Sequence, residues 1–246
     1  MSTGWFRKAA SQGIHRSALN DGSGARRAES SSRNQQRDCA VIIDAFLYAP
    51  RARDLGETTR ILFFHVPCAW IATLAFLTSA VYSVLYLRKS RLNYDVWAQS
   101  SAHIGLIFSV LASVTGAVWA NEIWGHPWNW DPRQTSIFIL MLIYAAYFAL
   151  RSAIEDDERR ARLAAVYSII AFVTVPFFMY IYPRIYDTLH PDPLINQQGK
   201  IQMNGKMQYV FFSSLAGFTL LYYWMLRLKV EVVHLAQKID TRNLEN

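Results

Sequence analysis

Residues 61–87, ILFFHVPCAWIATLAFLTSAVYSVLYL, form one long run without an acidic side chain, a lysine or an arginine. A transmembrane helix needs roughly 20 apolar residues to cross a hydrocarbon core about 30 Å thick. Further apolar segments, most of them of comparable length, lie at 96–120, 135–150, 163–182 and 207–226. Strands of a β-barrel would alternate polar and apolar residues over short stretches, and these segments do not. We therefore predict an all-α integral membrane protein with five clear transmembrane helices.

The composition of the 246-residue chain argues against other classes of protein. The chain is 52% hydrophobic and 17% charged, whereas a soluble domain has about a quarter of charged residues. The net charge is +7, and residues 1–38 contribute +4 of it. A nucleic-acid-binding protein would present a basic face on a folded domain. The sequence shows no such face, so we expect a lipid bilayer and no nucleic acid as its partner.

The distribution of basic residues orients the predicted helices. Lysine and arginine are concentrated after the first, third and fifth apolar segments, beginning at Arg88, Arg151 and Arg227. Cytoplasmic loops of membrane proteins carry an excess of these residues, so we assign the three regions to the cytoplasmic side. The outer face then receives three segments, residues 50–60, 121–134 and 183–206.

The region before residue 50 is harder to interpret. Residues 39–48 (CAVIIDAFLY) are apolar but would give only about 15 Å of helix, and they include Asp44. This short segment is therefore a doubtful first span, and the side of the N-terminus stays open. We divide the chain into three parts: a polar, basic N-terminal tail (1–38), a transmembrane domain (39–230) and a cytoplasmic C-terminal tail (231–246).

Four tryptophans, Trp119, Trp124, Trp128 and Trp130, lie close together in the loop at 119–136. One interpretation is an interfacial belt, in which indoles lie at the level of the lipid headgroups. A belt has one or two aromatic residues at each helix end, whereas this loop concentrates four among charged residues. Indole faces for stacking and Arg133 for carboxylates predict a site for a flat apolar ligand with acidic edges.

The end of this loop carries the signals of a helix start. Asp131 is a favourable N-cap, Pro132 fits the first helical position, and Gln134 lies where a capping box requires it. We therefore expect the third transmembrane helix to begin at Pro132. The positive end of its dipole would point at the tryptophan loop and favour an anionic group there.

Two histidines, His65 and His190, lie on the same side of the membrane as the tryptophan loop when the spans are counted. Taken together, they could ligate a haem iron axially, although a histidine near a helix end is often only hydrogen-bonded. We interpret His126 as a loop residue beside the ligand and His103 as a polar contact between helices. Cys68 is interpreted as a small packing residue.

The loop pattern Trp124-Gly-x-x-Trp128-x-Trp130-Asp131-x-Arg133 resembles the WWD signature of haem-handling proteins in cytochrome c biogenesis. Two flanking motifs, Arg60-Ile-x-x-x-His65-Val-Pro67 and Asp187-Thr-Leu-His190, extend this resemblance to CcmC, the haem exporter protein C family of system I. The three motifs occur in the family's order, and the resemblance covers residues from about 57 to 230.

The resemblance implies a protein of six spans at the outer face of the cell inner membrane. Its cargo would be haem b, bound transiently and non-covalently by the WWD loop and by axial ligands at His65 and His190. The implied recipient is the membrane-anchored chaperone CcmE. The implied partners are CcmD and the ATP-binding cassette pair CcmA and CcmB. The family transfers haem and is not an enzyme family, and the sequence shows no hydrolytic constellation or phosphate-binding loop.

Two alternatives share part of this pattern. A system II protein of the CcsA type also carries the WWD motif, but such chains have more spans and additional transmembrane histidines. A b-type electron carrier would place its histidines mid-helix between spans, and a transporter would interrupt its helices near the midplane. In the sequence only Pro176 offers such an interruption.

Overall fold

The computed structural model describes residues 57–190 and 203–245. These residues are helical or in short connections, and five helices are long and apolar enough to cross a membrane. The five predicted spans are thereby confirmed, while the doubtful segment at 39–48 and the tail at 1–38 lie outside the described residues. The elements are η2 (Glu57–Ile61), α2 (Leu62–Lys89), α3 (Leu92–Trp124), α4 (Pro132–Ser152), α5 (Asp157–Pro176), η3 (Phe177–Ile181), α6 (Tyr182–Ile185) and α7 (Gly205–Glu245).

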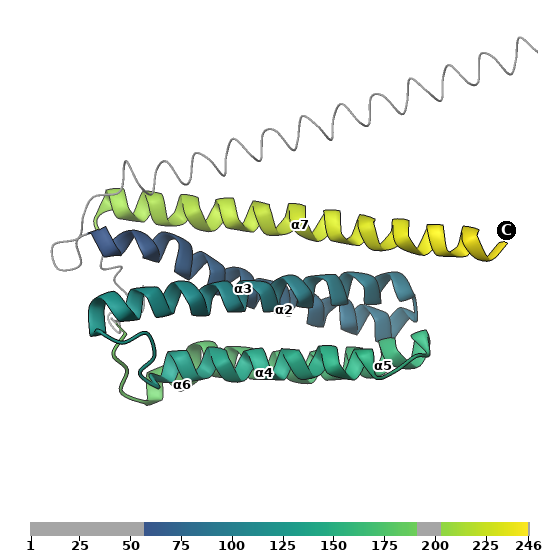
Figure 1. The fold of residues 1–246 in the computed structure, drawn as a ribbon, viewed down its shortest axis with the longest axis horizontal. Coiled ribbons are helices and arrows are strands. Elements are labelled where there is room, and N and C mark those ends of the chain that lie inside the picture. The colour runs from purple at the N-terminus through teal and green to yellow at the C-terminus, as the bar shows by residue number, and fades with distance from the viewer. Residues whose placement is uncertain (1–56, 191–202, 246) are drawn as a thin grey trace, which may run out of the picture.

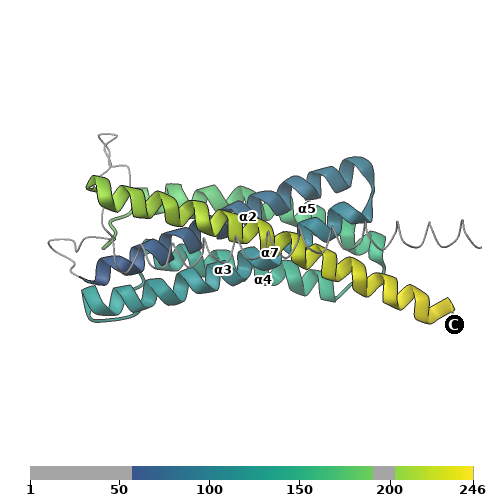
Figure 2. The same cartoon turned by 90° about the horizontal axis from the view of Figure 1, so that it is seen from above.

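The long helices pack in three layers around α2 and α3 (Figure 1). The helix α7 covers one side of this central pair and crosses it at an angle (Figure 2), and α4 and α5 cover the other side. The α2–α3 and α4–α5 connections lie at one end of the bundle, whereas the α3–α4 loop, α6 and the start of α7 lie at the other. This second end therefore holds the tryptophan loop.

Close packing of small and aromatic side chains holds the central helices together. Phe76 of α2 stacks on Tyr144 of α4 with ring centroids 3.5 Å apart. An added Cβ at Gly105 of α3 would lie 2.6 Å from the Phe76 ring, so only glycine fits there. Ser79 and Ser168 join α2 to α5 through a hydrogen bond of 3.0 Å. Such contacts between small and hydroxyl residues are typical of helix association in membranes.

A buried ion pair joins α4 to α3 at the end away from the tryptophan loop. The Arg151 guanidinium donates to both carboxylate oxygens of Asp95 at 2.7 Å and to the Gln99 amide oxygen at 3.0 Å. In the sequence Arg151 opens the basic region that follows the third apolar segment, and in the structure it lies in the last turn of α4 and is buried. Its charge is neutralised within the bundle, and the bidentate geometry of the pair orients the two helices.

One helix boundary agrees with the sequence-based prediction, and two helices continue further than predicted. The helix α4 begins at Pro132, as the capping pattern predicted. The segment after Pro176 continues through the π-helical turn η3 into α6, and α7 continues to Glu245 through most of the region assigned to a C-terminal tail.

His103 accepts a hydrogen bond from Lys229 of α7, so it makes the expected polar contact between helices. Cys68 is 4% exposed and packs in the core, which confirms its interpretation.

Candidate functional site

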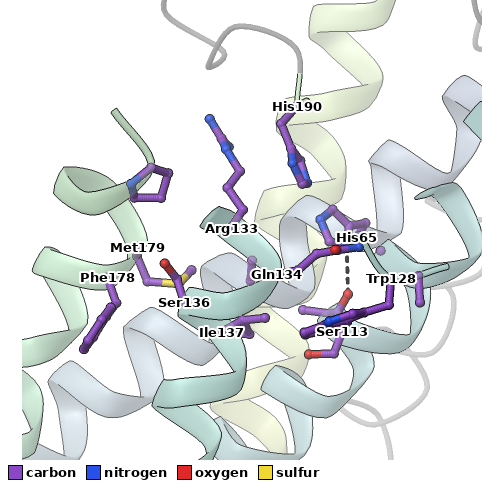
Figure 3. A pocket seen from close by; sticks show the side chains of 15 residues that line it. His65, Ser113, Trp128, Arg133, Gln134, Ser136, Ile137, Phe178, Met179 and His190 are labelled. Atoms are coloured by element: carbon purple, nitrogen blue, oxygen red, sulfur yellow. Dashed lines mark hydrogen bonds between the residues drawn. The ribbon is translucent and has the colours of Figure 1, made fainter. Parts of the chain in front are cut away.

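A cavity of about 120 Å³ lies at the tryptophan-loop end of the bundle, between α2 and α3 on one side and α4, η3 and α6 on the other. His65 from α2 and His190 from the segment after α6 both line it, and Figure 3 shows the two rings beside each other. Two residues distant in sequence thus meet at one place. The remaining polar and aromatic lining includes Ser113, Trp128, Arg133, Gln134, Ser136 and Phe178.

Hydrogen bonds to α3 fix the orientation of the His65 ring. Its Nδ1 donates to the Ala112 carbonyl oxygen at 3.0 Å and lies 3.2 Å from the Thr115 hydroxyl oxygen. A carbonyl oxygen only accepts, so Nδ1 carries a proton, and in the neutral ring the lone pair is on Nε2. The Nε2 atom is therefore the one that can coordinate a metal.

Gly116 allows this ring to lie directly against α3. An added Cβ at Gly116 would lie 2.8 Å from His65 Cε1 and 3.3 Å from Nδ1. This role was not predicted from the sequence, although Ala112 and Gly116 form the small-xxx-small spacing that marks close helix contacts. The glycine thus determines where the His65 ring lies.

Asp131 joins the start of α4 to the segment that carries His190. Its side chain accepts from the Arg133 backbone N–H at 2.9 Å, which is the predicted N-cap interaction. It also accepts from the Thr188 hydroxyl at 2.8 Å and from the Leu189 N–H at 2.7 Å. The His190 Nδ1 atom lies 2.8 Å from the same carboxylate. One buried aspartate therefore holds both the helix end and the second histidine.

The electrostatics of this cluster keep Asp131 ionised and His190 neutral. Burial by itself raises the pKa of Asp131, but hydrogen bonds from Arg133, Thr188 and Leu189 outweigh it, so the pKa falls below its usual value. Burial lowers the pKa of His190 to about 4, against the opposing effect of Asp131. At neutral pH, His190 therefore donates its Nδ1 proton to a carboxylate and keeps a free lone pair on Nε2.

The four indoles separate into two pairs. Trp119 and Trp124 contact the His190 ring, with centroids 6.1 Å and 5.1 Å away, and contact each other edge to face. Trp128 and Trp130 form a second edge-to-face pair at 5.6 Å. The first pair holds the histidine, and the second borders the cavity and the surface beside it.

The backbone around Trp130 is strained, and neighbouring side chains hold it. Trp130 has φ of 56° and is 73% exposed, and a bulky residue rarely adopts this left-handed conformation. Gln134 accepts from the Asn129 N–H at 2.8 Å and donates to the Pro127 carbonyl oxygen at 3.1 Å. The predicted capping box is therefore wrong in detail, because Gln134 bonds the loop and not the N-cap backbone.

Arg133 provides a cationic edge to the cavity. It lines the cavity together with the two histidines, and its Nε atom is buried without a hydrogen-bond partner among the described residues. The Ser136 hydroxyl in the same lining is also buried and unpartnered there. An unsatisfied buried donor is costly, so an anionic ligand group would be stabilised at this position. His126, in contrast, is exposed and outside the cavity lining.

Comparison with known proteins finds one family and several curated relatives. The family described as "Heme exporter protein C" (CcmC) matches residues 37–245. A "Heme exporter protein C" from Paracoccus denitrificans is 31% identical over 193 residues, covering 78% of this chain and 80% of the relative. The namesake from Bradyrhizobium diazoefficiens is 32% identical over 174 residues, covering 71% of this chain and 66% of the relative. The chain thus spans about two thirds of the length of the Bradyrhizobium relative.

Proposed function

Because this chain belongs to the heme exporter protein C (CcmC) family, we propose that it binds haem b non-covalently at the outer face of the cell inner membrane and transfers it to the chaperone CcmE. Membership of this family makes it a multi-pass membrane protein of haem export in cytochrome c maturation. The binding site, the recipient and the direction of transfer are parts of the proposal.

The observation that carries the proposal is the meeting of His65 and His190 at one cavity. In both rings Nδ1 is the donor of a hydrogen bond, which leaves Nε2 as the coordinating atom. Two neutral imidazoles of this kind suit the axial positions of a haem iron. The Arg133 guanidinium, whose buried Nε has no hydrogen-bond partner among the described residues, suits a haem propionate.

The size of the cavity indicates how a macrocycle would lie. Pockets that enclose drug-sized ligands have roughly 300–1,000 Å³, whereas this cavity has about 120 Å³. A haem held here would therefore extend beyond the cavity onto the neighbouring surface, where Trp128 and Trp130 lie. A haem that is partly exposed suits a cargo that must leave the protein. A redox haem buried between transmembrane helices would not be exposed in this way.

The same geometry supports the CcmC-type function over the two alternatives. An electron carrier would hold its ligands mid-helix, but the cavity is at the end of the bundle, and one ligand comes from a connection. The five described spans also favour the CcmC type over the longer CcsA type. We further propose that CcmA, CcmB and CcmD are partners of this chain, because it belongs to the CcmC family. The sequence shows no phosphate-binding loop, so any ATP hydrolysis that drives haem export would have to come from another subunit.

The direct test of transfer is co-expression with and without CcmE. We expect the purified protein to carry haem when CcmE is absent, and haem-loaded CcmE to accumulate when both are present. The measurement is haem content per protein, from absorption spectra of both purified proteins. Haem on CcmE in equal amounts without this chain would contradict the transfer role.

Replacing Gly116 with alanine should weaken haem binding although no ligand is removed. The new Cβ would lie 2.8 Å from the His65 ring, so the ring must move away from its hydrogen bond to Ala112. We expect a loss of affinity of about tenfold or more, since overpacking costs typically about 1–3 kcal/mol. The measurement is haem titration of the detergent-purified protein.

Gly105→Ala is the matched control for this variant. The added Cβ would lie 2.6 Å from the Phe76 ring, so the variant introduces the same kind of steric clash. The clash lies about 16 Å from Gly116 along α3, at roughly 1.5 Å of rise per residue. We expect lower thermal stability with unchanged haem affinity. Equal loss of affinity in both variants would show that Gly116 acts through general destabilisation.

A further inference from the structure

The two histidines of the cavity have hydrogen-bond acceptors of different charge. His65 Nδ1 donates to the neutral carbonyl of Ala112 at 3.0 Å, with the Thr115 hydroxyl nearby. His190 Nδ1 lies 2.8 Å from the carboxylate of Asp131. Hydrogen bonds to an ionised acceptor are shorter and roughly twice as strong as neutral ones. The two rings are therefore chemically inequivalent.

The surroundings of Asp131 fix the direction of its bond to His190. The carboxylate accepts from the Thr188 hydroxyl and from the backbone N–H groups of Arg133 and Leu189. With three other donors aimed at it and no exposed side-chain surface, Asp131 is an acceptor only. The proton between the two residues therefore lies on His190 Nδ1.

Thr188 makes this arrangement rigid. Its hydroxyl oxygen accepts from the His190 N–H at 3.2 Å while its proton goes to Asp131. Trp119 and Trp124 contact the same imidazole from two directions. The His190 ring thus has little freedom to rotate away from the carboxylate, so its Nδ1 atom stays next to the negative charge of Asp131.

We propose that Asp131, through its hydrogen bond from His190 Nδ1, makes His190 the more electron-donating iron ligand and so sets the preference of the site for ferric over ferrous haem. This inference rests on the proposed function. A carboxylate acceptor gives the imidazole partial anionic character and raises its basicity as a ligand. Ferric haem carries one more positive charge than ferrous haem, so negative charge on the ligand stabilises the ferric form more. Asp131 is here a positioning and tuning residue.

The test is titration of the detergent-purified Asp131→Asn protein with haem under oxidising conditions and under dithionite. Asparagine is as good an N-cap as aspartate, so α4 keeps its start while the charge is lost. We expect ferric affinity to fall about tenfold more than ferrous affinity. That ratio corresponds to a rise of about 59 mV in the reduction potential of the bound haem. Equal losses in the two oxidation states would overturn the proposal.

Two further variants separate charge from shape. Asp131→Glu keeps a carboxylate, so both affinities can fall but their ratio should stay near that of the wild type. Thr115→Val removes a neutral hydroxyl beside His65, which also donates to the Leu111 and Ala112 carbonyl oxygens. Any loss of haem affinity in this variant should be equal in both oxidation states. If the ratio of ferric to ferrous affinity changes as much in Asp131→Glu as in Asp131→Asn, the proposal is overturned. This comparison holds even if Asp131→Asn loses most of its haem.

The outcomes also distinguish this inference from the function on which it rests. A wild-type protein that binds haem in neither oxidation state contradicts the proposed function, and the inference fails with it. A wild-type protein that binds haem, with a ferric-to-ferrous ratio unaffected by Asp131→Asn, leaves the function standing and rejects the tuning role alone.

Discussion

Replacing either His65 or His190 with alanine should abolish the low-spin, bis-histidine spectrum of bound haem. In each ring Nδ1 faces an acceptor, the Ala112 carbonyl oxygen or the Asp131 carboxylate, so under the proposed function Nε2 would be the coordinating atom. Removing one ring leaves a five-coordinate iron and a space of imidazole size. We therefore expect weaker haem retention, and we expect added imidazole to restore part of the spectrum. The measurement is the absorption spectrum of each purified variant.

His103→Ala is the control for these substitutions. His103 bonds to Lys229 of α7. It lies about 20 Å along α3 from Gly116, at roughly 1.5 Å of rise per residue. Its loss should leave the spectrum unchanged. If instead both His65→Ala and His190→Ala keep a wild-type spectrum, the ligand assignment is wrong, and His126 becomes the next candidate.

Replacing Trp124, Trp128 and Trp130 together with alanine should abolish haem retention without unfolding the spans. An aromatic contact contributes about 0.5–1.5 kcal/mol beyond area burial, so one indole should account for at most about tenfold in affinity. The sequence predicts that the three act as a set, and the structure refines this expectation. Single losses of Trp128 or Trp130 should weaken binding with an unchanged spectrum. Loss of Trp124, which contacts His190, should also alter the spectrum.

Trp224→Ala is the matched control for the indole substitutions. Trp224 lies on α7 and is 37% exposed, as expected of an indole that faces lipid. Loss of the Trp224 indole should leave haem content unchanged.

If the triple variant of Trp124, Trp128 and Trp130 holds as much haem as the wild type, the indoles form an interfacial belt, and the platform interpretation fails. Haem content per protein, together with thermal stability, separates these results.

The spans and the helix start at Pro132 could be predicted from the sequence because they depend on local signals. Hydropathy averaged along one segment identifies a transmembrane helix without knowledge of its neighbours, and an N-cap followed by proline marks a helix start. Counting the spans was also sufficient to place His65 and His190 at one end of the bundle. Each of these inferences needs only the order of segments along the chain.

The contacts that orient the two histidines could not be predicted in this way. Asp131 and His190 lie far apart in the sequence, which offered only the N-cap role for the carboxylate. The close approach of His65 to Gly116 depends on how α2 packs on α3. Membrane helices lack the polar face that would reveal such packing, because lipid and bundle interior are both apolar. For the same reason the pairing of Arg151 with Asp95 could not be predicted.

The most direct test of the central claim is the absorption spectrum of the full-length wild-type protein, purified in detergent with haem and recorded in both oxidation states. The claim is that His65 and His190 hold one haem at the end of the bundle. It predicts a six-coordinate, low-spin haem at about one per chain, and this signal should disappear in the His65→Ala/His190→Ala double variant. A high-spin spectrum in the wild type, or an unchanged low-spin spectrum in the double variant, would contradict it.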